Sequence, residues 1–159
     1  MSKAFAAHLV AGDPPQAGTR TVPRICHTWQ DFAAVTGDED RLLLLLFHVE
    51  PDRTARAQGL PARDPGGIRG TLPDVWRLFY LVAASSIDAM RAQDLLAQAA
   101  VRLSRNPVID DANAGGGRHL VTELQAVSQD GMVSIWTGLH QPLRPSLVCC
   151  VRVEDDQVA

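Results

Sequence analysis

Four segments of the chain have the apolar pattern of β-strands. The first, residues 42–49, is apolar on both alternating faces, which is typical of a central strand covered on two sides. Leucine is not a strong strand former, so a helix stays open for this segment, and Pro51 limits its length. The other three strands are expected at residues 75–82, 120–127 and 146–153.

The clearest helix of the pattern runs from about residue 87 to residue 104. Ser85 and Asp88 have the spacing of a capping box, with Asp in place of the usual Glu, and Pro107 ends the helix. At about 100° per residue, one face collects Ala89, Ala92, Leu96, Ala99, Ala100 and Leu103. A narrow polar stripe lies opposite, flanked by Met90, Ala97 and Val101, and consists of Arg91, Asp94, Gln98 and Arg102. This wide apolar arc indicates either contact with a second element or subunit, or a well-buried helix in a monomer.

Two shorter helices and one long loop complete the pattern. A short helix is possible in residues 1–10, within a weakly patterned region that extends to residue 40, and another is expected at 131–139. The segment 50–74 is rich in Pro and Gly, and a loop of this length is usually functional or disordered. It contains Arg53, Arg56, Arg63 and Arg69. These arginines indicate either contact with an acidic surface or a solvated, flexible loop.

In chain order, the elements are strand, long loop, strand, helix, strand, short helix and strand. This order predicts an α+β fold, with a single four-stranded mixed sheet on which one long helix and one or two short helices pack. A chain of 159 residues fits one domain with a real core, so a single domain is expected over residues 1–159.

Composition narrows the classes of function. The chain is 46% apolar and 21% charged, as in an ordinary soluble globular protein. Its formal net charge of −3 gives no electrostatic reason to expect nucleic acid. The longest apolar run, Leu42–Phe47, is too short to span a membrane. Residues 1–10 make a poor signal peptide, which favours synthesis and assembly in the cytoplasm.

The residues that often carry chemistry form no recognisable site. The chain has an odd number of cysteines, two of them adjacent, which makes a poor disulfide framework. A metal site with His27 is a weaker explanation of Cys26, Cys149 and Cys150 than three buried thiols. The glycine run 115–117 lacks both the GxGxxG and the Walker lysine patterns of phosphate-binding loops. None of the five histidines lies in a nucleophile motif. No catalytic residue, metal or cofactor is therefore expected.

Several short blocks, in the same order along the chain, resemble one known family. Residues 75–84 followed by 97–109 resemble a strand and a helix of the cap, or tube-terminator, family of extracellular contractile injection systems, which include the Photorhabdus virulence cassette and antifeeding-prophage particles. Residues 44–50 resemble another strand of that family, and Ser134-Ile135-Trp136 resembles its short helix. Residues 142–153 resemble the closing strand of that family. The resemblance covers residues 41–153.

This resemblance implies a structural role. It implies a ring, of six subunits, at the end of the tube away from the baseplate, and kinship with the tail terminators of contractile phages. Such a ring would stop inner-tube growth and anchor the last sheath layer. Its partners would be further copies of this chain, the inner-tube protein and the sheath protein, with no nucleic acid and no membrane, in a particle of a kind that can be released from the cell.

The expected contacts with other subunits lie on the long loop, the polar side of the helix and the acidic tail. They are Arg53, Arg56, Arg63, Arg69, Met90, Arg91, Asp94, Gln98, Arg102, Glu154, Asp155 and Asp156. The last strand is a further candidate, for addition to the sheet edge of a partner. A small adaptor module of the particle is the alternative function, and an enzyme or nucleotide binder using the glycine loops ranks third.

Overall fold

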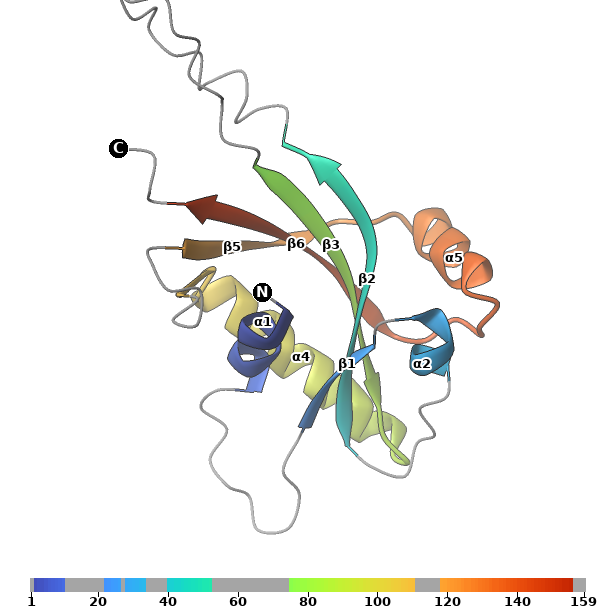
Figure 1. Ribbon diagram of the computed structural model, residues 1–159. Helices are drawn as coiled ribbons and strands as arrows, with labels where there is room; N and C mark the ends of the chain where they lie inside the picture. Colours follow the sequence, from blue (N-terminus) through green and yellow to red (C-terminus); the bar gives the residue numbers. More distant parts are fainter. Residues whose placement is uncertain are drawn as a thin grey trace, which may run out of the picture.

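The computed structural model describes residues 2–10, 22–26, 28–33, 40–52, 75–110 and 118–155 (Figure 1). They form one curled, mixed sheet of six strands with helices on both faces. The order across the sheet is β1 (Val22–Cys26), β2 (Arg41–Pro51), β3 (Trp76–Ser85), β6 (Ser146–Asp155), β5 (Arg118–Gln125) and β4 (Val108–Asp110). The helices are α1 (Ser2–Val10), α2 (Trp29–Ala33), α4 (Ala89–Arg105) and α5 (Gln129–Gly138).

The α+β class and the mixed sheet are confirmed, but the predicted number of four strands is wrong. All four predicted strands form, and residues 42–49 are strand and not helix. The two missed strands lie at the edges: β1 pairs in parallel with β2, and the three-residue β4 pairs with β5. β1 carries Pro23 and Arg24 in its interior and has no apolar alternation, so only its pairing reveals it as a strand.

The leucine run of β2 is apolar on both faces because both faces are covered. Leu42 and Leu44 belong to one buried cluster, and Leu43 and Leu45 belong to another on the opposite face. The coverage ends at Leu45. The prediction of a strand covered on two sides is therefore wrong for Leu46–Val49, which are exposed.

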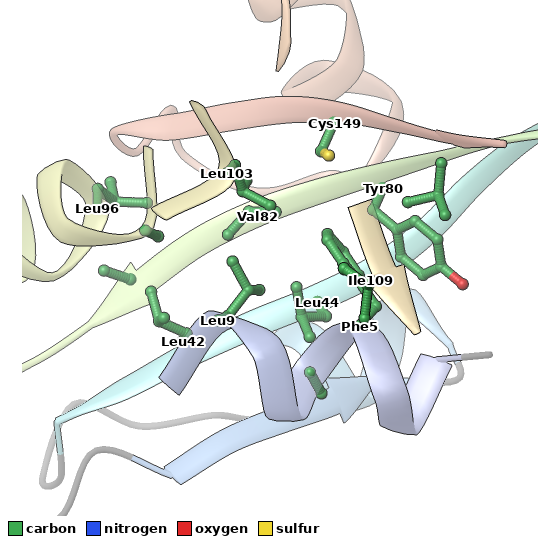
Figure 2. Close-up of a cluster of buried hydrophobic side chains, with 14 of the residues drawn as sticks. Phe5, Leu9, Leu42, Leu44, Tyr80, Val82, Leu96, Leu103, Ile109 and Cys149 are labelled. Carbon is green, nitrogen blue, oxygen red and sulfur yellow. The ribbon is translucent and has the colours of Figure 1, made fainter. Parts of the chain in front are cut away.

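The first cluster lies beneath α1 and α4, inside the curl of the sheet (Figure 1). Figure 2 shows Leu9 of α1 near Leu42 and Leu44 of β2, and the rings of Phe5 and Tyr80 lie 5.1 Å apart. α1 contacts α4 and also both edge strands, β1 and β4. This helix therefore bridges the two edges of the curled sheet and closes the first cluster.

The second cluster lies on the outer face, beneath α2 and α5. Trp136 of α5 is buried against Phe32 of α2, with ring centroids 5.7 Å apart. The indole Nε1 of Trp136 donates a hydrogen bond of 3.1 Å to Ser146 Oγ at the start of β6. Met132, Ile135 and Leu139 pack against the same cluster, as the predicted helical spacing requires.

The helix α4 begins one turn later than the capping-box prediction places it. Asp88 is the N-cap itself, since its Oδ1 accepts a hydrogen bond of 2.9 Å from the Met90 amide. Ser85 is instead the buried last residue of β3. Leu95 is buried although the predicted face omits it, and Ala89 is exposed although that face includes it.

The suggestion that the last strand adds to the sheet of a partner is wrong for its described residues. β6 is an interior strand, paired with β3 along residues 146–152 and with β5 along residues 148–155. Along residues 148–152 both of its backbone edges are thus occupied within the chain, and a partner strand there would have to displace β3 or β5. A single domain over residues 1–159 stays a prediction, and most of the long loop, residues 53–74, lies outside the described residues.

Candidate interaction surfaces

The predicted contact residues fall into three groups in the structure. Arg53, Arg56, Arg63, Arg69 and Asp156 lie outside the described residues. Glu154 and Asp155 end β6, in register with His119 and Arg118 of β5. The other five residues lie on α4, where their environments can be compared directly.

Three of the α4 residues are exposed and two are engaged within the chain. Met90, Asp94 and Gln98 are exposed. Arg91 Nε donates a hydrogen bond of 2.9 Å to Asp40 Oδ2, and the guanidinium of Arg102 donates to the Leu9 carbonyl at the end of α1. These two arginines hold α4 to neighbouring elements of their own chain, so a contact of either with another subunit stays a prediction.

Asp40 anchors the start of α4 through two donors. Besides Arg91, Ser86 Oγ donates a hydrogen bond of 2.7 Å to Asp40 Oδ1. The Arg91 hydrogen bond and then the Ser86 hydrogen bond hold the pKa of Asp40 below its ordinary value. At neutral pH the carboxylate is charged and fixes the turn between β3 and α4, which orients the exposed side of the helix.

Exposed apolar side chains gather on two surfaces. Of the ten large ones among the described residues, eight lie on these surfaces and two lie near α5. The first surface, here named the hairpin patch, is the exposed end of β2 and β3, with Leu46, Val49 and Trp76 on one face and Phe47 on the other. The second, here named the helix patch, is formed by Ile87, Met90, Val101 and Val108. Single exposed apolar residues are normal on a protein surface, but their concentration on two patches marks candidate interfaces.

The hairpin patch lies where β2 and β3 extend beyond β1. In the described residues, β1 pairs only with Arg41–Leu45 of β2, so the rest of β2 is a sheet edge. A β-bulge between Leu46 and His48 and the missing amide of Pro51 both interrupt the hydrogen-bonding pattern of this edge. These features disfavour the addition of a partner strand to this edge. A partner at the hairpin patch would therefore contact its side chains and not pair with its backbone.

The face of the hairpin that carries Phe47 combines aromatic rings with charged groups, since the rings of Phe47 and His48 lie 6.5 Å and 5.4 Å from that of Phe79. Arg77 Nη1 lies 3.2 Å from Glu50 Oε1, and His48 Nε2 lies 3.6 Å from Glu50 Oε2. Arg152 Nη1 of β6 lies 3.8 Å from Oδ2 of the buried Asp52. Because these ion pairs join β2, β3 and β6, they fix the end of the sheet on which the hairpin patch lies.

The cysteines are held as buried free thiols. Cys26 lies in the outer cluster and Cys149 in the inner cluster, on opposite faces of the sheet. Burial raises the pKa of Cys149 to about 12, so it is a neutral thiol at physiological pH.

The described residues contain no group of three His, Cys, Asp or Glu side chains able to hold a metal ion. His27 and Gly115–Gly117 lie outside the described residues.

Comparison with known proteins decides the family. A family model described as the Pvc16 N-terminal domain matches residues 13–157. The chain belongs to the Pvc16 N-terminal domain family. The match confirms the family resemblance of the sequence. Among the described elements, the matched range includes all six strands and the helices α2, α4 and α5, and α1 precedes it.

Two solved structures share the fold of this Pvc16 N-terminal domain. One is the PVC sheath/tube terminator of an extracellular contractile injection system, in the extended state, with 18% sequence identity and a TM-score of 0.58 over 96% of this chain and 53% of that chain. The other is the tube-terminating cap of the anti-feeding prophage, with 18% identity and a TM-score of 0.51 over 76% of this chain and 46% of that chain. The chain thus spans about half the length of the solved structures it matches. No curated protein matches the sequence.

A membrane-spanning helix is absent from the described parts of this Pvc16 N-terminal domain. The longest described helix, α4, has 17 residues, and no described helix combines the length and apolar character needed to cross a bilayer.

Proposed function

We propose that this Pvc16 N-terminal domain is a structural terminator of a contractile, phage-tail-like injection particle. It ends the growth of the inner tube and anchors the last sheath layer at the end distal to the baseplate. The observation that carries the proposal is the likeness over 96% of this chain to a structure described as a sheath/tube terminator, together with the family match. The anti-feeding prophage cap, described as tube-terminating, supports the same role.

The proposed partners are further copies of the chain, the inner-tube protein and the sheath protein. The proposed ring has six copies, and the role is structural and requires no catalytic residue. Assembly in the cytoplasm, followed by release with the particle, fits the extracellular injection system in which the PVC terminator occurs. The two exposed apolar patches supply surfaces for such contacts without any further change of fold.

Tube length tests this function. Deletion of the gene is expected to give inner tubes with a broad length distribution, because subunit addition at the distal end is no longer stopped. The lengths are measured by negative-stain electron microscopy of purified particles, and expression of the wild-type chain from a plasmid serves as the control and is expected to restore one narrow length. Particles of unchanged, uniform length from the deletion strain would contradict the proposal and favour the adaptor module.

A further inference from the structure

The exposed side of α4 carries five residues in a regular line, here named the α4 seam. They follow one another at intervals of four, three, four and three residues, and all of them are exposed: Met90, Asp94, Ala97, Val101 and Ser104. At about 100° per residue, they lie within about 40° of one line along the helix. This line is opposite the residues that α4 buries in the inner cluster.

Alternating intervals of three and four are the pattern by which one helix packs along another. Met90 is 66% exposed and Val101 is 48% exposed, and the small Ala97 between them lets a second helix approach closely. The outward side of a helix is ordinarily polar. The packing of α4 on the sheet and on α1 uses the other side of the helix, so it does not explain these apolar residues.

The apolar surface of the α4 seam has the size of one partner's share of an interface. Ile87, in the turn before α4, adds a side chain that is 86% exposed. With it, the apolar seam residues expose on the order of 400 Å², about half of the roughly 800 Å² that each partner buries in a standard protein–protein interface. One helix laid along α4 would cover this surface.

Asp94 is the charged position of the seam. Its carboxylate makes no ion pair with any residue that the structure describes, and Arg91, one turn earlier, is engaged with Asp40. A carboxylate that loses water inside an apolar contact is costly unless a cation pairs with it. A helix that covers the seam therefore needs a basic residue opposite Asp94, and such a pair also fixes the register of the two helices.

The same carboxylate disfavours a second copy of α4 as the partner. In a parallel, in-register pair of α4 helices, Asp94 faces another Asp94, so two like charges meet. In an antiparallel pair that brings Met90 to Val101, Asp94 faces Ala97 and loses water without gaining a cation. The other described helices, α1, α2 and α5, have 9, 5 and 10 residues and are shorter than the seam.

We infer that the α4 seam binds an α-helix of a different protein, with apolar side chains at the same alternating intervals and a lysine or arginine opposite Asp94. The apolar residues supply the buried contact. The ion pair at Asp94 selects the partner, because an acidic residue in its place would bring like charges together. This binding site goes beyond the proposed terminator function and does not depend on it.

Two synthetic helices of about three heptads test the selection by charge. Both carry leucine at the seam positions, and they differ only at the central one, which is arginine in the basic probe and glutamate in the acidic probe. A hydrocarbon staple on the outer side keeps each probe helical. The full chain is expected to bind the basic probe at least about tenfold more tightly than the acidic probe, as measured by fluorescence anisotropy. Asp94→Lys is expected to reverse this preference.

Matched controls are available on and near α5. Asp130→Lys makes the same charge change at an exposed site and is expected to leave the preference for the basic probe unchanged. Met90→Ser with Val101→Ser is expected to weaken the binding of both probes by more than about tenfold. Val133→Ser with Leu143→Ser changes residues that are 42% and 55% exposed and is expected to bind both probes like the wild type. Circular dichroism checks that every variant is folded.

A photo-cross-linker identifies the natural partner of the seam. Benzoylphenylalanine replaces Ala97 in the full chain, cells that express the chain from its own gene are irradiated, and mass spectrometry of the cross-linked peptides identifies the partner residue. The expected cross-link lies in a helix of another protein, with a lysine or arginine within one turn. The same cross-linker at Ser134, which is exposed on α5, is the control and is expected to give no such peptide.

Three results would overturn the inference. The first is a basic probe that binds no more tightly than the acidic probe, and the second is a preference that Asp94→Lys does not reverse. The third is a cross-link from Ala97 to a second copy of this chain or to no protein. None of them changes the expected tube lengths of the deletion strain, so the terminator function would be unaffected. Confirmed selection by charge combined with unchanged tube lengths would refute only the terminator function.

Discussion

Trp136→Ala is expected to lower the free energy of unfolding by about 3–5 kcal/mol. Trp136 is 1% exposed, and its ring lies at the centre of the outer cluster between α2, α5 and the sheet. Its loss leaves a cavity beside Phe32, and Ser146 Oγ loses the indole donor that joins α5 to β6. Urea denaturation followed by circular dichroism measures the change.

Val133→Ala is the matched control for Trp136→Ala. Val133 lies on the same helix and is 42% exposed, so its truncation is expected to cost less than about 1 kcal/mol. A loss of less than about 1 kcal/mol for Trp136→Ala itself would show that α5 does not pack on the sheet as described. The outer face of the sheet would then be open to a partner, and the assignment of the exposed surfaces would have to change.

Phe5→Ala is expected to have a similarly large effect, again about 3–5 kcal/mol. Phe5 is 1% exposed and packs on Tyr80, although α1 precedes the residues that the family model matches. The side chain fills the inner cluster where α1 bridges β1 and β4, and α1 contains no second phenylalanine that could replace it. Thermal and urea unfolding measure the loss.

The exposed Lys3 of the same helix provides the control for this change. Lys3→Ala is expected to leave the free energy of unfolding within about 0.5 kcal/mol of the wild type. If Phe5→Ala proved equally mild, α1 would not close the inner cluster, and the described packing of the curled sheet would be wrong. Equal and large losses for both variants would point to a change in helix formation instead of packing.

The sequence predicts those strands and helices whose apolar residues recur with the period of a strand or a helix. Residues 42–45 of β2 and 80–84 of β3 are apolar on both faces because helices cover both sides of the sheet there. The period of α4 predicts most of its buried residues, with Leu95 and Ala89 as the exceptions. The edge strands are different. β4 has three residues, and β1 contains Pro23, so their strand conformation comes from pairing with β5 and β2, which no local pattern records.

The candidate surfaces were predictable only in part. Met90 and its neighbours can be assigned to the exposed side of α4 from helical period alone. The hairpin patch cannot, because the exposure of Leu46 and Val49 depends on how far the helices cover the faces of the sheet, which no local pattern records. The roles of Arg91 and Arg102 also required the fold, since Asp40 and the end of α1 are far from α4 in sequence.

The position of the protein in the particle tests the central claim most directly. Particles that carry a gold label on a tag fused to this chain can be imaged by electron microscopy, with an untagged strain as the background control. A structural terminator predicts label at one end only of each particle, the end opposite the baseplate. Label along the whole sheath, at the baseplate or absent from intact particles would contradict the account.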